Sequence, residues 1–367
     1  MTQRLFSIFL MLVLSLGCVD RIDFNTHIVN YPVVVEGFIS DQPGPYEVRI
    51  TRSFDVQSKN AIKVDVSAKK VEIFDEDGNF EVLSEIKQGV YQTSAFGMQG
   101  QVGKAYKLKV EFLDGTIYES VPDTLMPTGN IDDVYFSFVN EKKADLTNYY
   151  GFDIYFDAQL SENHIDNALW RVVGTFQVDT NPEQRTVSCG ESKCPNPPPC
   201  SGWVANGFNL TEVGPCTCCT CWVNFESDLP IVSDNLIIQS GKYKGVKAYR
   251  FPLDGWVFQH KVYIKVNQMG LSPKALAFWK AIKAQKEANG SLFQPITGIV
   301  PNNFKQLSGE PAKIEGFFFS TSIHSKGIFI TRDDVPETSF IPSPGLAYQE
   351  SCLNIPHSTN QKPIFWQ

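Results

Sequence analysis

The most reactive side chains in this sequence are its cysteines, because a thiol can bind a metal, attack a substrate or form a disulfide. The chain has nine of them. Seven lie close together near the middle, one lies far downstream and one lies near the N-terminus: Cys189, Cys194, Cys200, Cys216, Cys218, Cys219 and Cys221, then Cys352, and Cys18. A catalytic thiol needs one reactive cysteine beside a histidine. The dense cluster therefore indicates cross-linking or metal binding instead.

Disulfides are the first interpretation of this cluster. Residues 181–221 contain Pro195-Asn-Pro-Pro-Pro199 and little hydrophobic patterning, so apolar burial cannot order the segment. A disulfide that closes a loop of about 15 residues contributes about 3 kcal/mol, so two or three would order it. The alternative is a metal site at Cys216-Thr-Cys-Cys-Thr-Cys221, but zinc ligands usually come as two separated Cys-x-x-Cys pairs. We therefore predict disulfides and no bound metal.

The pairing of these cysteines stays open at the level of sequence. The neighbours Cys218 and Cys219 are expected to bond to different partners, because a bond between them would be strained. One bridge can join the cluster to Cys352 and fix the C-terminal tail. Eight cysteines allow many pairings, and nothing in the sequence chooses among them.

Cys18 belongs to a different pattern, an export signal. Arg4 precedes the largely apolar run 5–16, which ends as Leu14-Ser-Leu-Gly-Cys18. The run is shorter than the roughly 20 apolar residues of a transmembrane helix, and no second long run follows. It resembles a bacterial lipoprotein signal, although Ser15 stands where leucine is usual. The resemblance implies a signal peptide at 1–17, acyl chains (palmitate) on Cys18 and a tether at 18–30. An ordinary secretory signal is the alternative.

Motifs for catalysis are missing from the sequence. The five histidines are scattered, and there is no His-Glu-x-x-His pair, Gly-x-Ser-x-Gly elbow, phosphate-binding glycine loop or dinucleotide fingerprint. Asp75-Glu-Asp-Gly78 has the chemistry of a β-turn and lacks the ligand spacing of an EF-hand. We predict a protein that is not an enzyme and has no cofactor. Its net charge of -8 argues against nucleic acid, which selects cationic surfaces.

Thr124 is a candidate modification site. Asp123-Thr-Leu125 resembles the Asp-Ser/Thr-apolar sequon for protein O-glycosylation in Bacteroidota. It falls in 122–129, where two prolines and a glycine predict a linker. A solvated turn without a glycan is the alternative.

The elements that must position these residues are mainly β-strands. Residues 31–40 are rich in β-branched side chains, and 46–51 alternate apolar and polar residues after a Pro-Gly turn, which predicts a hairpin. Segments 70–74 and 106–113 repeat the pattern. Short strands at this spacing predict an immunoglobulin-like β-sandwich over 31–127.

A second β-rich domain is predicted over 131–367, with the cysteine-rich segment 181–221 as an insertion. Its predicted strands are 134–139, 151–156, 169–178, 235–238, 247–251, 261–266, 316–320 and 327–331. In 261–266, alternation of apolar with basic residues indicates a half-exposed sheet.

One amphipathic helix is predicted over 272–289. Ser272 is a good N-cap and Pro273 suits the first helical position. Leu276, Trp279 and Ile282 fall on one helix face, which predicts packing against a sheet.

Taken together, these features resemble a family of Bacteroidota outer-membrane lipoproteins classed as a domain of unknown function. The resemblance is carried by Cys18, the strand at 33–38, the cysteine run 218–223, the helix start 271–279 and the tail 362–366. It implies a lipid-anchored protein, often encoded beside TonB-dependent receptors, with no established catalytic residues. Relatives often have more than one cysteine in the tail, where this chain has only Cys352.

The expected function is a non-catalytic accessory or binding subunit of a TonB-dependent β-barrel transporter, active in nutrient capture. The expected location is the outer membrane, at the cell surface, with attachment through the lipid. One alternative is a structural subunit of an outer-membrane assembly or export complex, and another is an enzyme whose site forms only in the folded chain. A concave pocket with aromatic side chains would favour ligand binding, and a flat apolar face would favour assembly.

Overall fold

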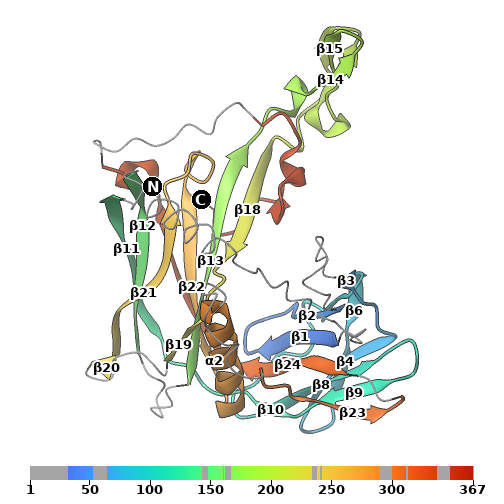
Figure 1. The fold of residues 1–367 in the computed structure, drawn as a ribbon, viewed down its shortest axis with the longest axis vertical. Helices are drawn as coiled ribbons and strands as arrows, with labels where there is room; N and C mark the ends of the chain where they lie inside the picture. Colours follow the sequence, from blue (N-terminus) through green and yellow to red (C-terminus); the bar gives the residue numbers. More distant parts are fainter. Residues whose placement is uncertain are drawn as a thin grey trace, which may run out of the picture.

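The computed structural model describes residues 32–52, 64–142, 148–159, 161, 167–233, 238–239, 242–288, 300–310, 313–336 and 348–366. These residues form two β-sandwiches, one α-helix and a projecting pair of hairpins (Figure 1). The predicted class, mainly β with one helix and a cysteine-rich insertion, is confirmed. Cys18 and the predicted signal peptide 1–17 lie outside the described residues. No helix in the described ranges is long and apolar enough to cross a membrane.

The first sandwich has two sheets. One contains, in order, β24 (Ile314–Thr321), β1 (Val33–Ser40), β2 (Glu47–Arg52), β7 (Val90–Gln92) and β6 (Ser84–Lys87), with β3 (Val64–Asp65) beside β2. The other contains β23 (Phe304–Ser308), β9 (Ile117–Ser120), β8 (Ala105–Glu111), β4 (Lys70–Asp75) and β5 (Phe80–Val82), with β10 (Asp123–Thr124) beside β8.

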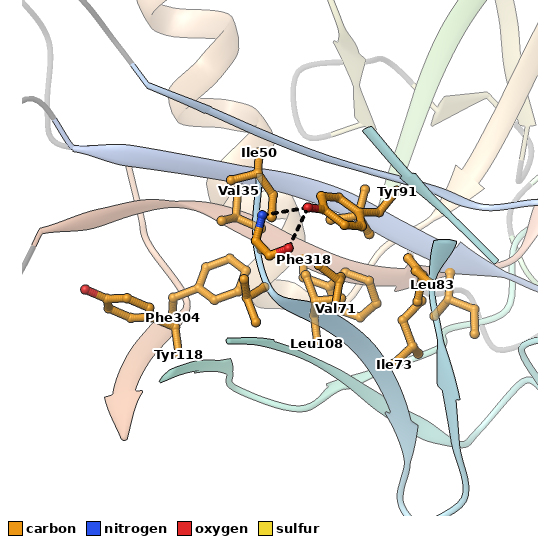
Figure 2. Packing of buried hydrophobic residues seen from close by; sticks show 14 of the residues in the cluster. Val35, Ile50, Val71, Ile73, Leu83, Tyr91, Leu108, Tyr118, Phe304 and Phe318 are labelled. Carbon is orange, nitrogen blue, oxygen red and sulfur yellow. Dashed lines mark hydrogen bonds between the residues drawn. The ribbon is translucent and has the colours of Figure 1, made fainter. Parts of the chain in front are cut away.

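Alternating apolar residues of both sheets build its core. Figure 2 shows Val35 and Ile50 from one sheet meeting Val71 and Leu108 from the other, all fully buried. Tyr91 is buried among them. Its hydroxyl donates a hydrogen bond to the Ala68 carbonyl at 3.0 Å and accepts one from the Ala68 amide. The predicted period-two pattern therefore gives the observed burial.

Two strands of this sandwich come from the far end of the chain. β24 pairs in parallel with β1, and β23 pairs with β9. The structure thus differs from the predicted division into 31–127 and 131–367, because β23 and β24 complete the first sandwich. Strand periodicity marks which residues form strands but not which distant strand is the neighbour. The two-sheet sandwich is present, whereas the immunoglobulin-like connectivity is not confirmed.

The predicted linker at 122–129 is also part of the fold. Asp123 and Thr124 form β10 against β8, and Met126 bridges to Thr321. Asp123 is buried, and its carboxylate accepts hydrogen bonds from the Ser272 hydroxyl and from the Ser320 amide at 2.9 Å. Burial raises the pKa of Asp123. This carboxyl group joins β10, β24 and the start of the helix.

The second sandwich is built from longer strands. One sheet contains β11 (Ile131–Lys142), β12 (Asn148–Gln159), β21 (Lys242–Pro252) and β20 (Ile238–Gln239). The other contains β25 (Ile323–Ile330), β22 (Val262–Gly270), β13 (Ala168–Asp179), β18 (Thr220–Glu226) and β26 (Ser358–Thr359), with β19 (Ile231–Val232) beside β13. Its core includes Phe152, Phe156 and Trp170, which are fully buried, and the Trp170 indole donates to the Gln268 side chain at 3.0 Å.

The helix α2 (Pro273–Ala288) lies where the two sandwiches meet (Figure 1). Ser272 caps it by accepting a hydrogen bond from the Ala275 amide at 3.1 Å. Phe278 is buried and stacks on Phe317 of β24 with 4.6 Å between ring centroids, and Leu169 of β13 belongs to the same cluster. The predicted helix is confirmed, and the predicted face, Leu276, Trp279 and Ile282, packs half-buried against this cluster beside the fully buried Ala275. The helix thus contacts strands of both sandwiches.

The insertion at 181–221, here called the flap, leaves the second sandwich between β13 and β18. It contains two hairpins, β14 (Thr186–Cys189) with β15 (Ser192–Pro195) and β16 (Trp203–Asn206) with β17 (Asn209–Glu212). It also contains the short 3-10 helices Pro182–Gln184 and Pro199–Ser201, and two more, Arg332–Asp334 and Cys352–Asn354, occur later in the chain. In Figure 1 β14 and β15 stand away from both sandwiches.

Candidate functional site

All eight cysteines of the described residues form disulfides. The pairs are Cys189–Cys194, Cys200–Cys218, Cys216–Cys219 and Cys221–Cys352. The prediction of cross-links is confirmed, as is the expectation that Cys218 and Cys219 bond to different partners. A thiolate metal site would need free thiols, and none of these eight is free.

The bridge from Cys221 to Cys352 fixes the C-terminal tail, residues 348–366, on the second sandwich. Both cysteines are fully buried. Beyond the bridge, β26 pairs with β18, and the indole of the buried Trp366 donates to the Gln177 side chain at 3.2 Å. Phe365 stacks on Tyr263 with 4.4 Å between ring centroids. The tail therefore covers part of the outward face of the sheet that contains β22.

A cleft of about 810 Å³ lies between the two sandwiches. Strands β1 and β2 of the first sandwich form one wall, and the outward face of β13, β18 and β22 forms the other. The tail contributes His357 and Phe365 at the margin. The lining includes Glu36, Phe38, Glu47 and Arg49 on the first wall and Arg171, Thr175, Asn224, Glu226, Tyr263 and Lys265 on the second. The volume is that of a typical small-molecule site.

The two arginines of the cleft are paired with glutamates. Arg49 Nε lies 2.5 Å from Glu47 Oε1, and Arg171 Nη2 lies 3.0 Å from Glu226 Oε1. The Arg171 guanidinium also lies over the Trp279 ring of α2, 5.4 Å from its centroid. The Glu47 hydrogen bond raises the pKa of Arg49. These pairs neutralise both guanidinium groups within the cleft walls.

Lys265 is different, because no hydrogen bond or ion pair joins it to the part of the chain that the structure describes. It lies half-buried on the outward face of β22, between Val173 of β13 and Gly327 of β25. Neither neighbour brings an acceptor side chain. The Tyr263 hydroxyl lies above Gly327, where a Cβ would approach it to 2.3 Å. Burial lowers the pKa of Lys265.

His357, at the margin of the cleft, has a left-handed backbone with φ 63°. Its carbonyl accepts a hydrogen bond from the Asn224 amide of β18 at 3.1 Å. Histidine adopts this conformation more readily than most residues, yet such positions are uncommon and gather at functional sites. This hydrogen bond places the tail beside Asn224, whose side chain accepts from the Thr175 hydroxyl in the same cleft.

A smaller hollow of about 560 Å³ lies near the Asp75 turn of the first sandwich. The Asp75 carboxylate accepts from the amide and the side chain of Asn79 at 2.8 Å each, and Gly78 takes φ 87°. The Asn79 side chain lowers the pKa of Asp75. The predicted β-turn is confirmed, with this carboxylate engaged by its own turn. Within the described ranges, no group of three or more His, Cys, Asp or Glu side chains is arranged to hold a metal.

Thr124, the predicted glycosylation site, is exposed on β10, whereas the neighbouring Asp123 is buried. A glycan on Thr124 would point into solvent without displacing core atoms. The modification stays a prediction.

Asp153, on β12 of the second sandwich, is a buried carboxylate held by two cationic side chains. It is 4% exposed and accepts from Arg250 at 2.5 and 2.8 Å and from Lys247 at 2.8 Å. The Arg250 hydrogen bonds are the main cause that lowers the pKa of Asp153 to about 2. The ionised carboxylate therefore stabilises the fold above about pH 4, its unfolded pKa, and this stabilisation is lost as the pH falls toward 2.

We expect Asp153→Asn to lower the free energy of unfolding by about 1–2 kcal/mol at neutral pH, after allowance for solvent screening of its partners. The difference from the unaltered protein should shrink between about pH 4 and pH 2, since there the wild-type carboxylate becomes neutral. Urea unfolding at several pH values measures it. Asp133→Asn is the control, because Asp133 is 60% exposed in its pair with Lys326 and should contribute less than about 0.5 kcal/mol. A pH-independent difference at Asp153 would contradict the assignment.

The sequence predicted the strand that contains Lys265 but not the cleft that this strand lines. Alternation of basic and apolar residues over 261–266 predicted a half-exposed strand, which the burial pattern of β22 confirms. The exposed half of this strand lines a cleft whose other wall is the first sandwich, and that arrangement depends on pairings far apart in the chain.

A family model described as "Domain of unknown function (DUF4249)" matches residues 21–327 of this chain. Searches of curated proteins and of solved structures gave no match.

Proposed function

The chain belongs to the DUF4249 family, whose function is unknown, and we propose that it is a non-catalytic, lipid-anchored binding protein that captures a ligand in the cleft between its sandwiches. The observation that carries the proposal is the cleft itself, with a volume of about 810 Å³ and walls of aromatic and charged side chains. Concave sites with a few convergent polar groups are the usual form of a binding site.

Strand pairing, helix packing and a disulfide fix the two walls and the margin of the cleft, which favours a preformed site. β24 pairs with β1 in the first sandwich, and the next strand, β25, pairs with β22 in the second. α2 packs at the junction, and the Cys221–Cys352 bridge fixes the tail at the margin. A preformed site loses less conformational entropy when the ligand binds.

We further propose that the protein is attached to the outer membrane through Cys18, at the cell surface, and passes its ligand to a TonB-dependent β-barrel receptor. The signal pattern that ends at Cys18 supports the anchor. Four disulfides support export, because such bonds persist in oxidising compartments. The receptor rests on the family resemblance, which also suggests an origin in the Bacteroidota.

A structural subunit of an outer-membrane assembly or export complex is the second candidate, and the flap favours it. Val204, Phe208 and Val213 are 52%, 69% and 66% exposed on a segment held by three disulfides. Exposed apolar side chains on a projection are a common feature of partner-binding surfaces.

Purification from outer membranes in mild detergent, through a tag after the last residue, tests both candidates. We expect a β-barrel protein to co-purify with the full chain, and Cys18→Ser to release the protein from the membrane, since the anchor is lost. Phe208→Ser separates the candidates. If the flap holds an assembly complex together, the variant should no longer co-purify with the β-barrel. If the flap is not needed for docking, the β-barrel should still co-purify. Absence of a barrel from the full-chain preparation would refute both.

A further inference from the structure

We propose that Lys265 binds a carboxylate of the captured ligand, so that the cleft selects ligands with a single negative charge beside an apolar or aromatic group. This inference rests on the proposed function, because it names the chemistry of the same cleft.

Among the basic side chains that line the cleft, Lys265 differs in having no acidic partner in the described part of the chain. Arg49 and Arg171 each have a glutamate within 3.0 Å on their own wall. Lys265 has no such partner among the described residues, and its cross-strand neighbours are Val173 and Gly327. The space above Gly327 is taken by the ring and hydroxyl of Tyr263, which bring no negative charge to the lysine. The cleft therefore presents one ammonium group that a ligand can pair.

Burial makes this arrangement unfavourable until an anion arrives. A charged group that loses water without gaining a partner costs free energy, and burial accordingly lowers the pKa of Lys265. A carboxylate within hydrogen-bond distance would restore the lost interactions. Charge-assisted hydrogen bonds of this kind are among the stronger ones in proteins.

The charges around the lysine favour a carboxylate over a phosphate. The cleft also contains Glu36, Glu47, Glu226 and Asp228, from both walls, besides His357 of the tail. These carboxylates would repel a phosphate dianion. The two arginines would not offset that repulsion, because each is already paired with a glutamate. A single negative charge matches the one ammonium that is available.

Aromatic side chains beside Lys265 define the rest of the ligand. Tyr263 lies two residues away on the same face of β22, stacked against Phe365. On the opposite wall, Phe38 is half-buried and stacks on Phe319 at 5.5 Å. Beside Tyr263, on the neighbouring strand β13, the Thr175 hydroxyl donates to the Asn224 side chain at 2.7 Å. An apolar or aromatic group next to the carboxylate would pack on these rings.

N-acetylphenylalanine and its amide form a matched pair of probes, since they differ only in the carboxylate. Ligand-observed NMR with the full chain in detergent should show that the acid binds about tenfold or more tightly than the amide. Lys265→Met should remove this preference, and Lys265→Arg should retain it. Lys305→Met, an exposed lysine of β23 outside the cleft, is the control and should change nothing.

Equal binding of acid and amide to the unaltered protein, or no binding of the acid, would overturn the role of Lys265. So would an unchanged preference in Lys265→Met. Because Lys265→Met replaces a half-buried unpaired charge, it should unfold at the same or a higher temperature, which excludes misfolding as the cause of lost binding. Co-purification of a β-barrel is independent of these results, so the proposed function can stand if the lysine fails.

Discussion

Gly316→Ala is expected to destabilise the protein by on the order of 4 kcal/mol, at the upper end of what single substitutions do. Gly316 has φ +123°, which side-chain-bearing residues rarely adopt, and an added Cβ would lie 2.0 Å from the carbonyl oxygen of Val35. Val35 is its direct partner in the parallel pairing of β24 with β1. Alanine therefore forces the two strands apart where the distant end of the chain closes the first sandwich.

Substitutions at two other glycines distinguish the cost of the positive φ from the cost of the close contact with Val35. Denaturant titration measures the stability of each variant. Gly103 has φ +91° but open space around its Cβ position, so Gly103→Ala measures backbone strain alone, about 1–2 kcal/mol. Gly214 has neither feature, and Gly214→Ala should stay within about 0.5 kcal/mol of the unaltered protein. If Gly316→Ala costs no more than Gly103→Ala, close packing of β24 on β1 is not what requires glycine.

Loss of the Cys221–Cys352 bridge is expected to have an effect of similar size. The bridge closes a sequence separation of 131 residues, and both cysteines are fully buried. A disulfide that closes a loop this long contributes about 4–5 kcal/mol in the chain-entropy model, and measured losses are about 2–5 kcal/mol. The double variant Cys221→Ser/Cys352→Ser should unfold at lower denaturant concentration and expose its tail to proteases. It should also bind ligand more weakly, because the tail supplies His357 and Phe365 to the cleft margin.

The matched control is Cys189→Ser/Cys194→Ser. That bridge spans a separation of only five residues within the β14–β15 hairpin of the flap. Its removal should leave the unfolding of the sandwiches and the protease resistance of the tail almost unchanged. Equal losses in the two double variants would mean that the bridges act through a general effect of free thiols and not through the tail.

Local elements were predictable because their signals lie within a few residues. Alternation over 106–113 marked the strand observed as β8 (Ala105–Glu111), and Ser272 with Pro273 marked the start of α2. The presence of disulfides followed from clustered cysteines in a chain with a predicted export signal. In each case the residues that carry the signal are those that form the element or the bond.

Long-range partners were not predictable from the same patterns. Nothing in the apolar run 316–320 distinguishes a strand of the second sandwich from one that pairs with β1, since both need the same alternation. The partner of Cys352 depends on where the tail crosses β18. The half-exposed strand 261–266 was predicted, but its place in a cleft was not, because the opposite wall of that cleft comes from the other sandwich.

The parallel pairing of β1 with β24 also constrains the order in which the protein folds during synthesis. Residues 33–40 leave the ribosome early, yet their neighbour at 314–321 follows nearly three hundred residues later. Until then β1 has an unpaired edge and Phe318 is missing from the core that contains Val35. Contacts this distant form slowly, and unpaired edges invite aggregation. We therefore expect the growing chain to depend on chaperones until residues 314–321 have been released.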